Sequence, residues 1–310
     1  MKPRLINPLR YPGSKSSFVE EFSELIKTSN LVGKSIVEPY AGSSSISLGM
    51  LHKGLVPFAT LIERDPLIYS FWHCVFAKTE ELIASIELLE VTLDTWYLME
   101  KYRHLDNPTQ ENILEMGLAG LFFNRTNFSG VLHAGPIGGK TQTSAYPVDC
   151  RFNKKDIVKR ILAVSKFADQ VQVIFGDAID FMKNANLEDN SNRFFYIDPP
   201  YYKQGSKLYR YHYDLIKHKL LADTLAESTY KWILSYDKHH VIEHFYTKFN
   251  KITRDFRYSS HSPKQEKELL ITNIDGWITP LDQLKSDINI VRLNSDISTS
   301  KSLSLLVQES

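Results

Sequence analysis

The sequence predicts an α/β fold in which helices cover both faces of a mostly parallel β-sheet. Five short apolar segments, rich in β-branched and aromatic residues, alternate with stretches of helical period. Two more apolar segments follow each other late in the chain without a helix between them, which indicates a terminal antiparallel hairpin. One long interruption of the alternation indicates an inserted subdomain.

The strand candidates are short, and polar or turn residues bound each of them. The five alternating segments lie at residues 35–38, 58–63, 171–175, 193–197 and 231–236, and the terminal pair lies at 251–258 and 268–272. The stretches between them are amphipathic: one helical face is formed by Phe18, Phe22, Leu25 and Ile26, and another helix is indicated by Leu215, Leu220, Leu221 and Leu225. Such alternation is typical of a parallel sheet.

The interruption is helical at first and then irregular. Residues 79–102 are expected to form one or two helices, and a further helix should start at residues 107–109 and run on through Phe122. Residues 124–153 are rich in Gly, Ser, Thr and Asn, and so long a loop in a compact domain is usually functional. We therefore predict a discontinuous main domain (1–69 and 167–294), a mainly helical insertion (70–166) and a mobile polar tail (295–310).

Composition excludes several classes of protein. With 43% hydrophobic and 24% charged residues, the 310-residue chain is not of the disordered type. Its two cysteines, Cys74 and Cys150, cannot form a disulfide framework or a four-ligand zinc site by themselves. Neither a membrane-spanning apolar run nor a signal-peptide core is present, so we expect a cytoplasmic protein that does not bind membranes.

The net charge of +1 does not by itself indicate a polyanionic partner, but basic residues gather in two places. Either place could contact phosphates or could simply be a solvated face. The first group is Lys154, Lys155, Lys159, Arg160 and Lys166, and the second is Lys203, Lys207, Arg210, Lys217 and Lys219.

The most specific chemical motif is Asp198-Pro199-Pro200-Tyr201, directly after a predicted strand. Open α/β sheets bind ligands at the carboxyl ends of their strands. Two consecutive prolines remove N–H donors, so this turn offers a carboxylate and carbonyl oxygens as acceptors. Such acceptors suit an exocyclic amine, and Tyr201 adds a flat surface on which a base could stack. The alternative is a turn whose aspartate caps a helix.

Three other segments are expected near the same edge. Small residues follow the first strand at Ala41-Gly42-Ser43 and would let a ligand approach the backbone closely, although a glycine turn before a helix is the simpler interpretation. Glu63 ends the second strand, where ribose hydroxyls are usually held, and Asp65 competes for this role. The segment around Lys15 lacks the glycine spacing of a phosphate loop, which excludes a nucleoside triphosphatase.

These segments, in this order, resemble the DNA adenine methylase family, the α-group of N6-adenine methyltransferases. The matching segments are Arg10-Tyr11-Pro12-Gly13-Ser14-Lys15, Val37-Glu38-Pro39-Tyr40-Ala41-Gly42, Glu63, Gly176-Asp177 and Asp198-Pro199-Pro200-Tyr201. The resemblance reaches to about residue 275 and implies a Rossmann-like class I methyltransferase sheet with an inserted target-recognition subdomain. It also implies S-adenosylmethionine as methyl donor, no metal, and double-stranded DNA as substrate.

The resemblance assigns roles residue by residue. Asp198 and the Pro199 carbonyl would hold the target amine beside Pro200, and Tyr201 would stack on an adenine flipped out of the duplex. The remaining roles are cofactor binding by Tyr11, Lys15, Glu38, Ala41, Gly42, Glu63 and Asp177, and DNA contact by Arg125, Asn127 and Phe128, the last as a wedge between bases. For the three DNA residues, helix-end and turn structure is the alternative.

Two departures and several alternatives stay open. Ser43-Ser44-Ser45 stands where the family commonly has a second glycine, and the sequence after Gly130 differs from that of the GATC methylases, which leaves the recognition sequence open. Other acceptors would be RNA adenine, cytosine N4 or a protein amide, and a catalytically silent DNA-binding module is a second class. A nicotinamide oxidoreductase would need a fuller glycine pattern. We expect a monomer, which a cognate restriction endonuclease could accompany.

Overall fold

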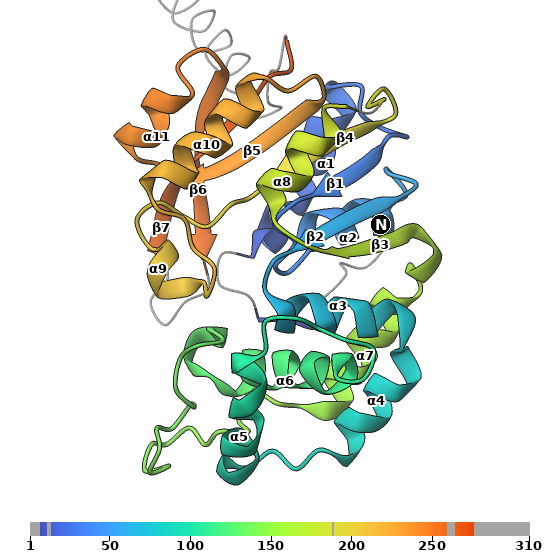
Figure 1. The fold of residues 1–310 in the computed structure, drawn as a ribbon, viewed down its shortest axis with the longest axis vertical. Helices are drawn as coiled ribbons and strands as arrows, with labels where there is room; N and C mark the ends of the chain where they lie inside the picture. The colour runs from blue at the N-terminus through green and yellow to red at the C-terminus, as the bar shows by residue number, and fades with distance from the viewer. Residues whose placement is uncertain (1–6, 11–13, 188, 259–263, 276–310) are drawn as a thin grey trace, which may run out of the picture.

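The computed structural model describes residues 7–10, 14–187, 189–258 and 264–275 and contains one seven-stranded sheet (Figure 1). The strand order is β3-β2-β1-β4-β5-β7-β6; the first five are parallel, and β7 lies antiparallel between β5 and β6. The strands are β1 (Ser35–Glu38), β2 (Ala59–Glu63), β3 (Val171–Phe175), β4 (Arg193–Ile197), β5 (Lys231–Asp237), β6 (Asn250–Tyr258) and β7 (Lys264–Thr272). The predicted sheet and terminal hairpin are confirmed.

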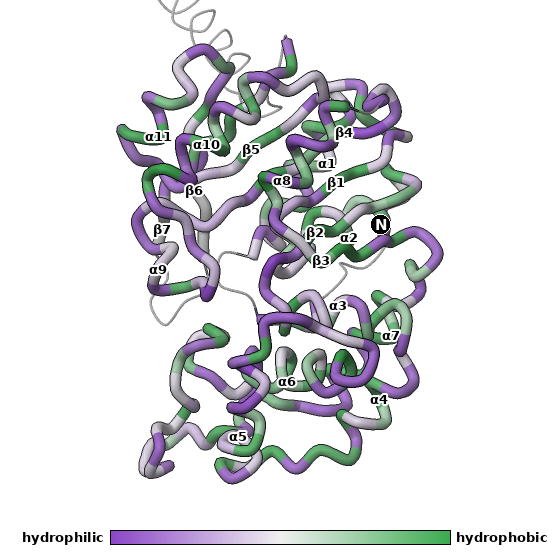
Figure 2. Tube along the Cα trace, viewed as in Figure 1, coloured by the Kyte–Doolittle hydropathy of each residue, from purple (hydrophilic) through white to green (hydrophobic). Residues whose placement is uncertain are grey.

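The sheet is buried on both faces because alternate strand residues point in opposite directions. In β4, Phe194 and Tyr196 join one apolar cluster, which includes residues of α1 and α2, while Phe195 and Ile197 join the other, which includes α8, α10 and α11. Figure 2 shows apolar residues along much of β1 and β5, as expected for strands covered on both sides.

The helices lie between the strands in the predicted places. They are α1 (Val19–Thr28), α2 (Ser45–Lys53), α3 (Pro66–Ala77), α4 (Thr79–Leu88), α5 (Leu93–Met99), α6 (Ile113–Thr126), α7 (Lys154–Ser165), α8 (Ala178–Ala185), α9 (Gly205–Leu208), α10 (Leu215–Ala226) and α11 (His240–Phe245). The predicted start of a helix at residues 107–109 is wrong. Asn112 Oδ1 accepts the Thr109 N–H at 2.7 Å in a preceding turn, and α6 begins only at Ile113.

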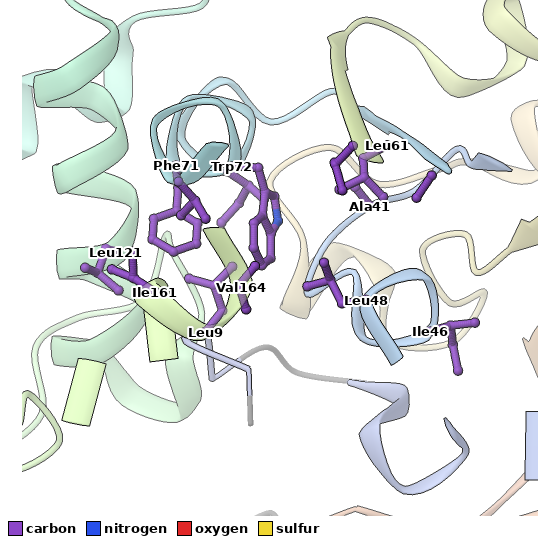
Figure 3. Close-up of a cluster of buried hydrophobic side chains, with 14 of the residues drawn as sticks. Leu9, Ala41, Ile46, Leu48, Leu61, Phe71, Trp72, Leu121, Ile161 and Val164 are labelled. Atoms are coloured by element: carbon purple, nitrogen blue, oxygen red, sulfur yellow. The ribbon is translucent and has the colours of Figure 1, made fainter. Parts of the chain in front are cut away.

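Helices α3 to α7 gather beyond the carboxyl edge of the sheet (Figure 1). Their apolar residues join the cluster on one face of the sheet, and Figure 3 shows Phe71 and Trp72 of α3 near Leu121 of α6 and Val164 of α7. The proposed boundary at residue 70 falls inside α3. This helix packs against both the sheet and α6, so it belongs equally to the two proposed parts. The division into a main domain and an insertion remains a proposal, and the predicted tail at 295–310 lies outside the described residues.

Candidate active site

The loops after β1 and β4 open side by side at the edge of the sheet. These strands are neighbours, and the strand order reverses between them, which is where open parallel sheets bind ligands. One pocket lies there. It is lined by eight of the sequence-predicted site residues, namely Lys15, Glu38, Ala41, Gly42, Glu63, Asp177, Asp198 and Pro200. The structure thus brings together side chains from five separate segments of the chain.

The loop after β1 is held in a tight, ligand-accommodating conformation. Gly42 (φ 45°) and Ser44 (φ 50°) both lie in the left-handed region. The Gly42 carbonyl accepts the indole N–H of Trp72 at 2.8 Å, and the Gly42 N–H donates to Glu63 Oε2 at 2.9 Å. Because both backbone groups of Gly42 are bonded to buried side chains, the loop is fixed before any ligand binds.

Two buried glutamates end β1 and β2 beside this loop. Glu38 Oε2 accepts the N–H of Ser47 in the first turn of α2, at 3.1 Å, and burial raises the pKa of Glu38 to about 8. Burial, together with the charge of Asp65, raises the pKa of Glu63 to about 7. Asp65, the rival candidate for the ribose role, caps α3 through the Leu67 N–H at 2.9 Å and forms a 3.2 Å ion pair with Arg210.

Asp198 reaches the pocket with one carboxylate oxygen already engaged. Its Oδ1 lies 3.0 Å from the ammonium of Lys15 and accepts the Ser235 hydroxyl at 2.8 Å. Ser235 stands on the neighbouring strand β5 and is fully buried. Burial alone would lower the pKa of Lys15, but the carboxylates of Asp198 and Glu268 raise it well above its usual value, so the lysine stays charged. The arrangement orients the Asp198 carboxylate toward the pocket from behind.

Tyr201 lies behind the pocket instead of lining it. Its side chain is buried, and its hydroxyl accepts a hydrogen bond from Lys15 Nζ at 2.6 Å and donates to Glu268 Oε1 at 2.5 Å. Among the described residues, neither Tyr201 nor Pro199 belongs to the pocket lining. In this structure Tyr201 therefore fixes the Asp198 corner, and the ring face predicted to stack on a base is covered.

Aromatic residues that do line the pocket are Tyr40 and those of the segment Tyr209-Arg210-Tyr211-His212-Tyr213. Tyr213 shares a 2.9 Å hydrogen bond with the Tyr40 hydroxyl, and Arg64 lies 5.0 Å from the centre of the Tyr211 ring. The guanidinium of Arg210 donates to the Arg103 carbonyl at 2.6 Å, which links this segment to the helical subdomain. The segment borders the pocket with flat surfaces suited to a base.

Comparison with known proteins identifies the family of this chain. The profile of the D12 class N6 adenine-specific DNA methyltransferase family matches residues 11–260. The chain belongs to this family. Adenine-specific DNA methylation at N6 is therefore the activity of the D12 methyltransferase described here, and the resemblance seen in the sequence is confirmed.

The structure also has distant similarity to solved structures of other proteins. A candidate RNA methyltransferase from Pyrococcus horikoshii is 11% identical, with 85% of this chain and 84% of that chain covered and a TM-score of 0.36. An S-adenosylmethionine-dependent methyltransferase from Agrobacterium tumefaciens is 7% identical, with 84% and 62% covered and a TM-score of 0.34. No curated protein matches the sequence.

The predicted DNA-contact residues of the D12 methyltransferase fall into two groups. Arg125 is buried and donates to the Pro8 carbonyl, while the Asn127 amide accepts from Trp96 Nε1 at 2.7 Å and donates to the carbonyls of Val131 and Leu132. Both side chains therefore make buried contacts within the protein in this structure, and their role in DNA contact stays a prediction. Phe128, by contrast, is 59% exposed.

Two other cofactor predictions have different outcomes. Asp177 accepts the N–H groups of Ile179 and Asp180 and so caps α8, and it also lines the pocket, where cofactor binding stays a prediction. Tyr11 lies outside the described residues. No helix among the described residues is long and apolar enough to span a membrane, and no group of three or more potential metal ligands occurs in the same part of the chain.

Sequence reasoning missed three polar residues behind Asp198, namely Ser235, Asp237 and Glu268. Ser235 and Asp237 stand at the carboxyl end of β5, and Asp237 accepts the N–H groups of Tyr202 and Lys203 at 2.9 and 3.1 Å. The antiparallel direction of β7 brings Glu268 opposite Asp237. Polar residues at the ends of predicted strands were the signal that could have found them, once the strand order was known.

Proposed function

We propose that this chain transfers the methyl group of S-adenosylmethionine to N6 of an adenine flipped out of double-stranded DNA. One observation carries this proposal. The Asp198 carboxylate and the small-residue loop around Gly42 line the same pocket, so an amine held by the first can face a methyl donor held by the second. Placing the two reactants together removes much of the entropy cost of bringing them into contact.

The pocket residues fit the methyl donor chemically. Carboxyl groups of Glu38, Glu63 and Asp198 line a space that would receive a positively charged sulfonium, whose charge would favour their ionised forms. The Ala41 and Gly42 backbone leaves room for close approach. Glu63 is placed at the end of β2, where its carboxylate can accept from ribose hydroxyls. When bound, S-adenosylmethionine supplies the activated methyl group.

The residues of the chain supply orientation and charge. Lys15 and Ser235 hold Asp198 Oδ1, so Oδ2 can accept an N–H of the adenine amine, and the Pro199 carbonyl is proposed to accept the other. With both N–H groups bonded, the nitrogen lone pair turns toward the methyl group. Asp198 then accepts the proton that nitrogen releases after the new bond forms. Electrostatic stabilisation in a partly dry site is the main catalytic term.

Base flipping costs a few kcal/mol of unstacking, which stacking within the protein must offset. Tyr209, Tyr211 and Tyr213 border the pocket and are proposed to provide that surface, in place of the buried Tyr201. The helical subdomain, with exposed Phe128, is proposed to contact the duplex. We further propose that the protein acts on duplex DNA as a monomer, with or without a cognate restriction endonuclease.

The test is methyl transfer from labelled S-adenosylmethionine to unmethylated duplex DNA, followed by nucleoside analysis. N6-methyladenine is the expected product. If N4-methylcytosine is the only product, the substrate is cytosine in DNA, and if only RNA is methylated, the substrate is RNA; either result would contradict the adenine-in-DNA assignment. Tight DNA binding without any methyl transfer would indicate a catalytically silent DNA-binding module instead of an enzyme. Sedimentation of the same sample tests the monomer.

A further inference from the structure

A second carboxylate lies behind Asp198 in the same buried cluster. Glu268 is 1% exposed and stands on β7, opposite Asp237 of β5. The ammonium of Lys15 lies between the two carboxylates, 3.0 Å from Asp198 Oδ1 and 3.3 Å from Glu268 Oε2. Glu268 is not part of the pocket lining. It can therefore influence the reaction only through the residues that it contacts.

The hydroxyl of Tyr201 completes the cluster. It accepts a hydrogen bond from Lys15 at 2.6 Å and donates one to Glu268 Oε1 at 2.5 Å. Glu268 thus holds both neighbours of Asp198, the lysine by charge and the tyrosine by its hydroxyl. Buried charges this close need such pairing to be tolerated.

The charge balance gives Glu268 a purpose beyond packing. Lys15 paired with Asp198 alone would form a neutral pair. Among the described side chains, the ion pairs of this cluster join one ammonium to two carboxylates, which together carry a net charge of −1 when both acids are ionised. During transfer the nitrogen lone pair forms the N–C bond, the electrons of the S–C bond return to sulfur, and positive charge moves from sulfur to N6. A net negative cluster beside N6 favours that movement, and the released proton goes to Asp198.

We propose that Glu268 is a positioning residue for methyl transfer. Its carboxylate keeps the cluster around Lys15 negatively charged, so that Asp198 can stabilise the positive charge that develops on the adenine amine and then accept its proton. This inference rests on the proposed function. It adds a residue from the C-terminal hairpin to a site otherwise built from the parallel part of the sheet.

The ionisation of Glu268 makes the proposal testable by pH. The pKa of Glu268 is raised to about 7: burial raises it most, the charge of Lys15 lowers it and that of Asp198 raises it. In the part of the chain that the structure describes, the other groups facing this position include Tyr201 and Tyr209, the cross-strand neighbour Asp237, and Arg254 of β6, which is paired with Glu21. Protonation of Glu268 would cancel the net charge, so the rate should fall as pH drops through about 7.

The experiment measures single-turnover methyl transfer at saturating S-adenosylmethionine and duplex DNA between about pH 5.5 and 8.5. The variant is Glu268→Gln, and the matched control is Glu227→Gln, the same change at an exposed position after α10. We expect wild type and control to lose up to tenfold per pH unit below about 7. Glu268→Gln should be about 10–100-fold slower at pH 8 and nearly independent of pH, with S-adenosylmethionine binding retained.

Two results would overturn the inference. One is a Glu268→Gln variant whose methyl-transfer rate at pH 8 equals that of the wild type. The other is a Glu268→Gln variant whose rate falls below about pH 7 as steeply as the wild-type rate does. If Glu268→Gln does not fold, the pH titration of the glutamate carboxyl carbon-13 resonances in the wild type tests the proposal instead. The Glu268 resonance is assigned as the one that Tyr201→Phe perturbs. A Glu268 carboxyl that stays protonated up to about pH 8.5 would refute the proposal, because the cluster would then have no net negative charge in the range where the enzyme works. A wild type that methylates nothing defeats the proposed function instead, and the carboxyl titration still tests the charge cluster.

Discussion

At the scale of single residues, Asp198 is the group on which the chemistry depends. Lys15 and Ser235 occupy one of its oxygens, at 3.0 and 2.8 Å, and the carboxylate lines the pocket shared with the Gly42 loop. The division of labour between its two oxygens, one for the protein and one for the substrate, follows from these contacts. Tyr201 belongs to the supporting contacts, because its hydroxyl lies between Lys15 and Glu268.

Replacing Asp198 by alanine should lower the methyl-transfer rate by about 10³-fold or more, because the amine loses its charged acceptor. S-adenosylmethionine affinity should change by less than about tenfold, since the Gly42 loop and Glu63 are untouched. Single-turnover rates and calorimetric binding check the two halves separately. Undiminished turnover would refute the role assigned to this residue.

Asn127 and Phe128 adjoin in sequence but should respond differently to truncation. Asn127→Ala removes three buried hydrogen bonds, to Trp96, Val131 and Leu132, and leaves their partners unsatisfied. We expect a loss of about 2–4 kcal/mol in the free energy of unfolding. Urea denaturation measures it, and an unchanged unfolding midpoint would contradict the structural role.

Phe128→Ala is expected to leave stability within about 0.5 kcal/mol of wild type, because the side chain is 59% exposed. If the ring enters the base stack, the variant should flip the target base less. Fluorescence of 2-aminopurine at the target position reports extrahelical base directly. Equal fluorescence gain on binding of variant and wild type would exclude the wedge role.

At the scale of elements, the sheet decides which residues meet. The carboxyl ends of β1 and β4 are adjacent, so the loops at Gly42 and Asp198 share a pocket although more than half of the chain's length separates them. The hairpin of β6 and β7 adds Glu268 to the residues behind the pocket. Its antiparallel direction places Glu268 opposite Asp237, at the edge where the pocket lies.

At the scale of the whole molecule, strand and helix patterns predicted the architecture because both sheet faces are buried. The motif order then predicted the pocket, since residues after parallel strands share one edge. The positions of Arg125, Asn127 and Tyr201 were not predictable in this way, because burial depends on contacts with distant segments such as Pro8 and β7. Ser235, Asp237 and Glu268 escaped for the same reason, as no local pattern reveals which strands are neighbours.

The buried site should also make stability depend on pH. The pKa of Glu38 is about 8 in the folded chain against about 4.5 for an ordinary glutamate, so folding favours its protonated form. Its contribution to the unfolding free energy is complete below about pH 4.5 and is lost as pH rises through about 8, by up to about 1.4 kcal/mol per pH unit. Glu38→Gln, which cannot ionise, should gain stability relative to wild type as pH rises. A pH-independent difference in urea unfolding would contradict this.

The central claim is that the Asp198 carboxylate holds the adenine amine opposite the methyl donor. A crystal structure of the protein with duplex DNA and a non-reactive S-adenosylmethionine analogue tests it most directly. We predict an extrahelical adenine whose N6 lies within about 3.2 Å of Asp198 Oδ2, with the analogue against the Gly42 loop. A target adenine still stacked in the duplex, or an analogue bound away from this pocket, would contradict the account.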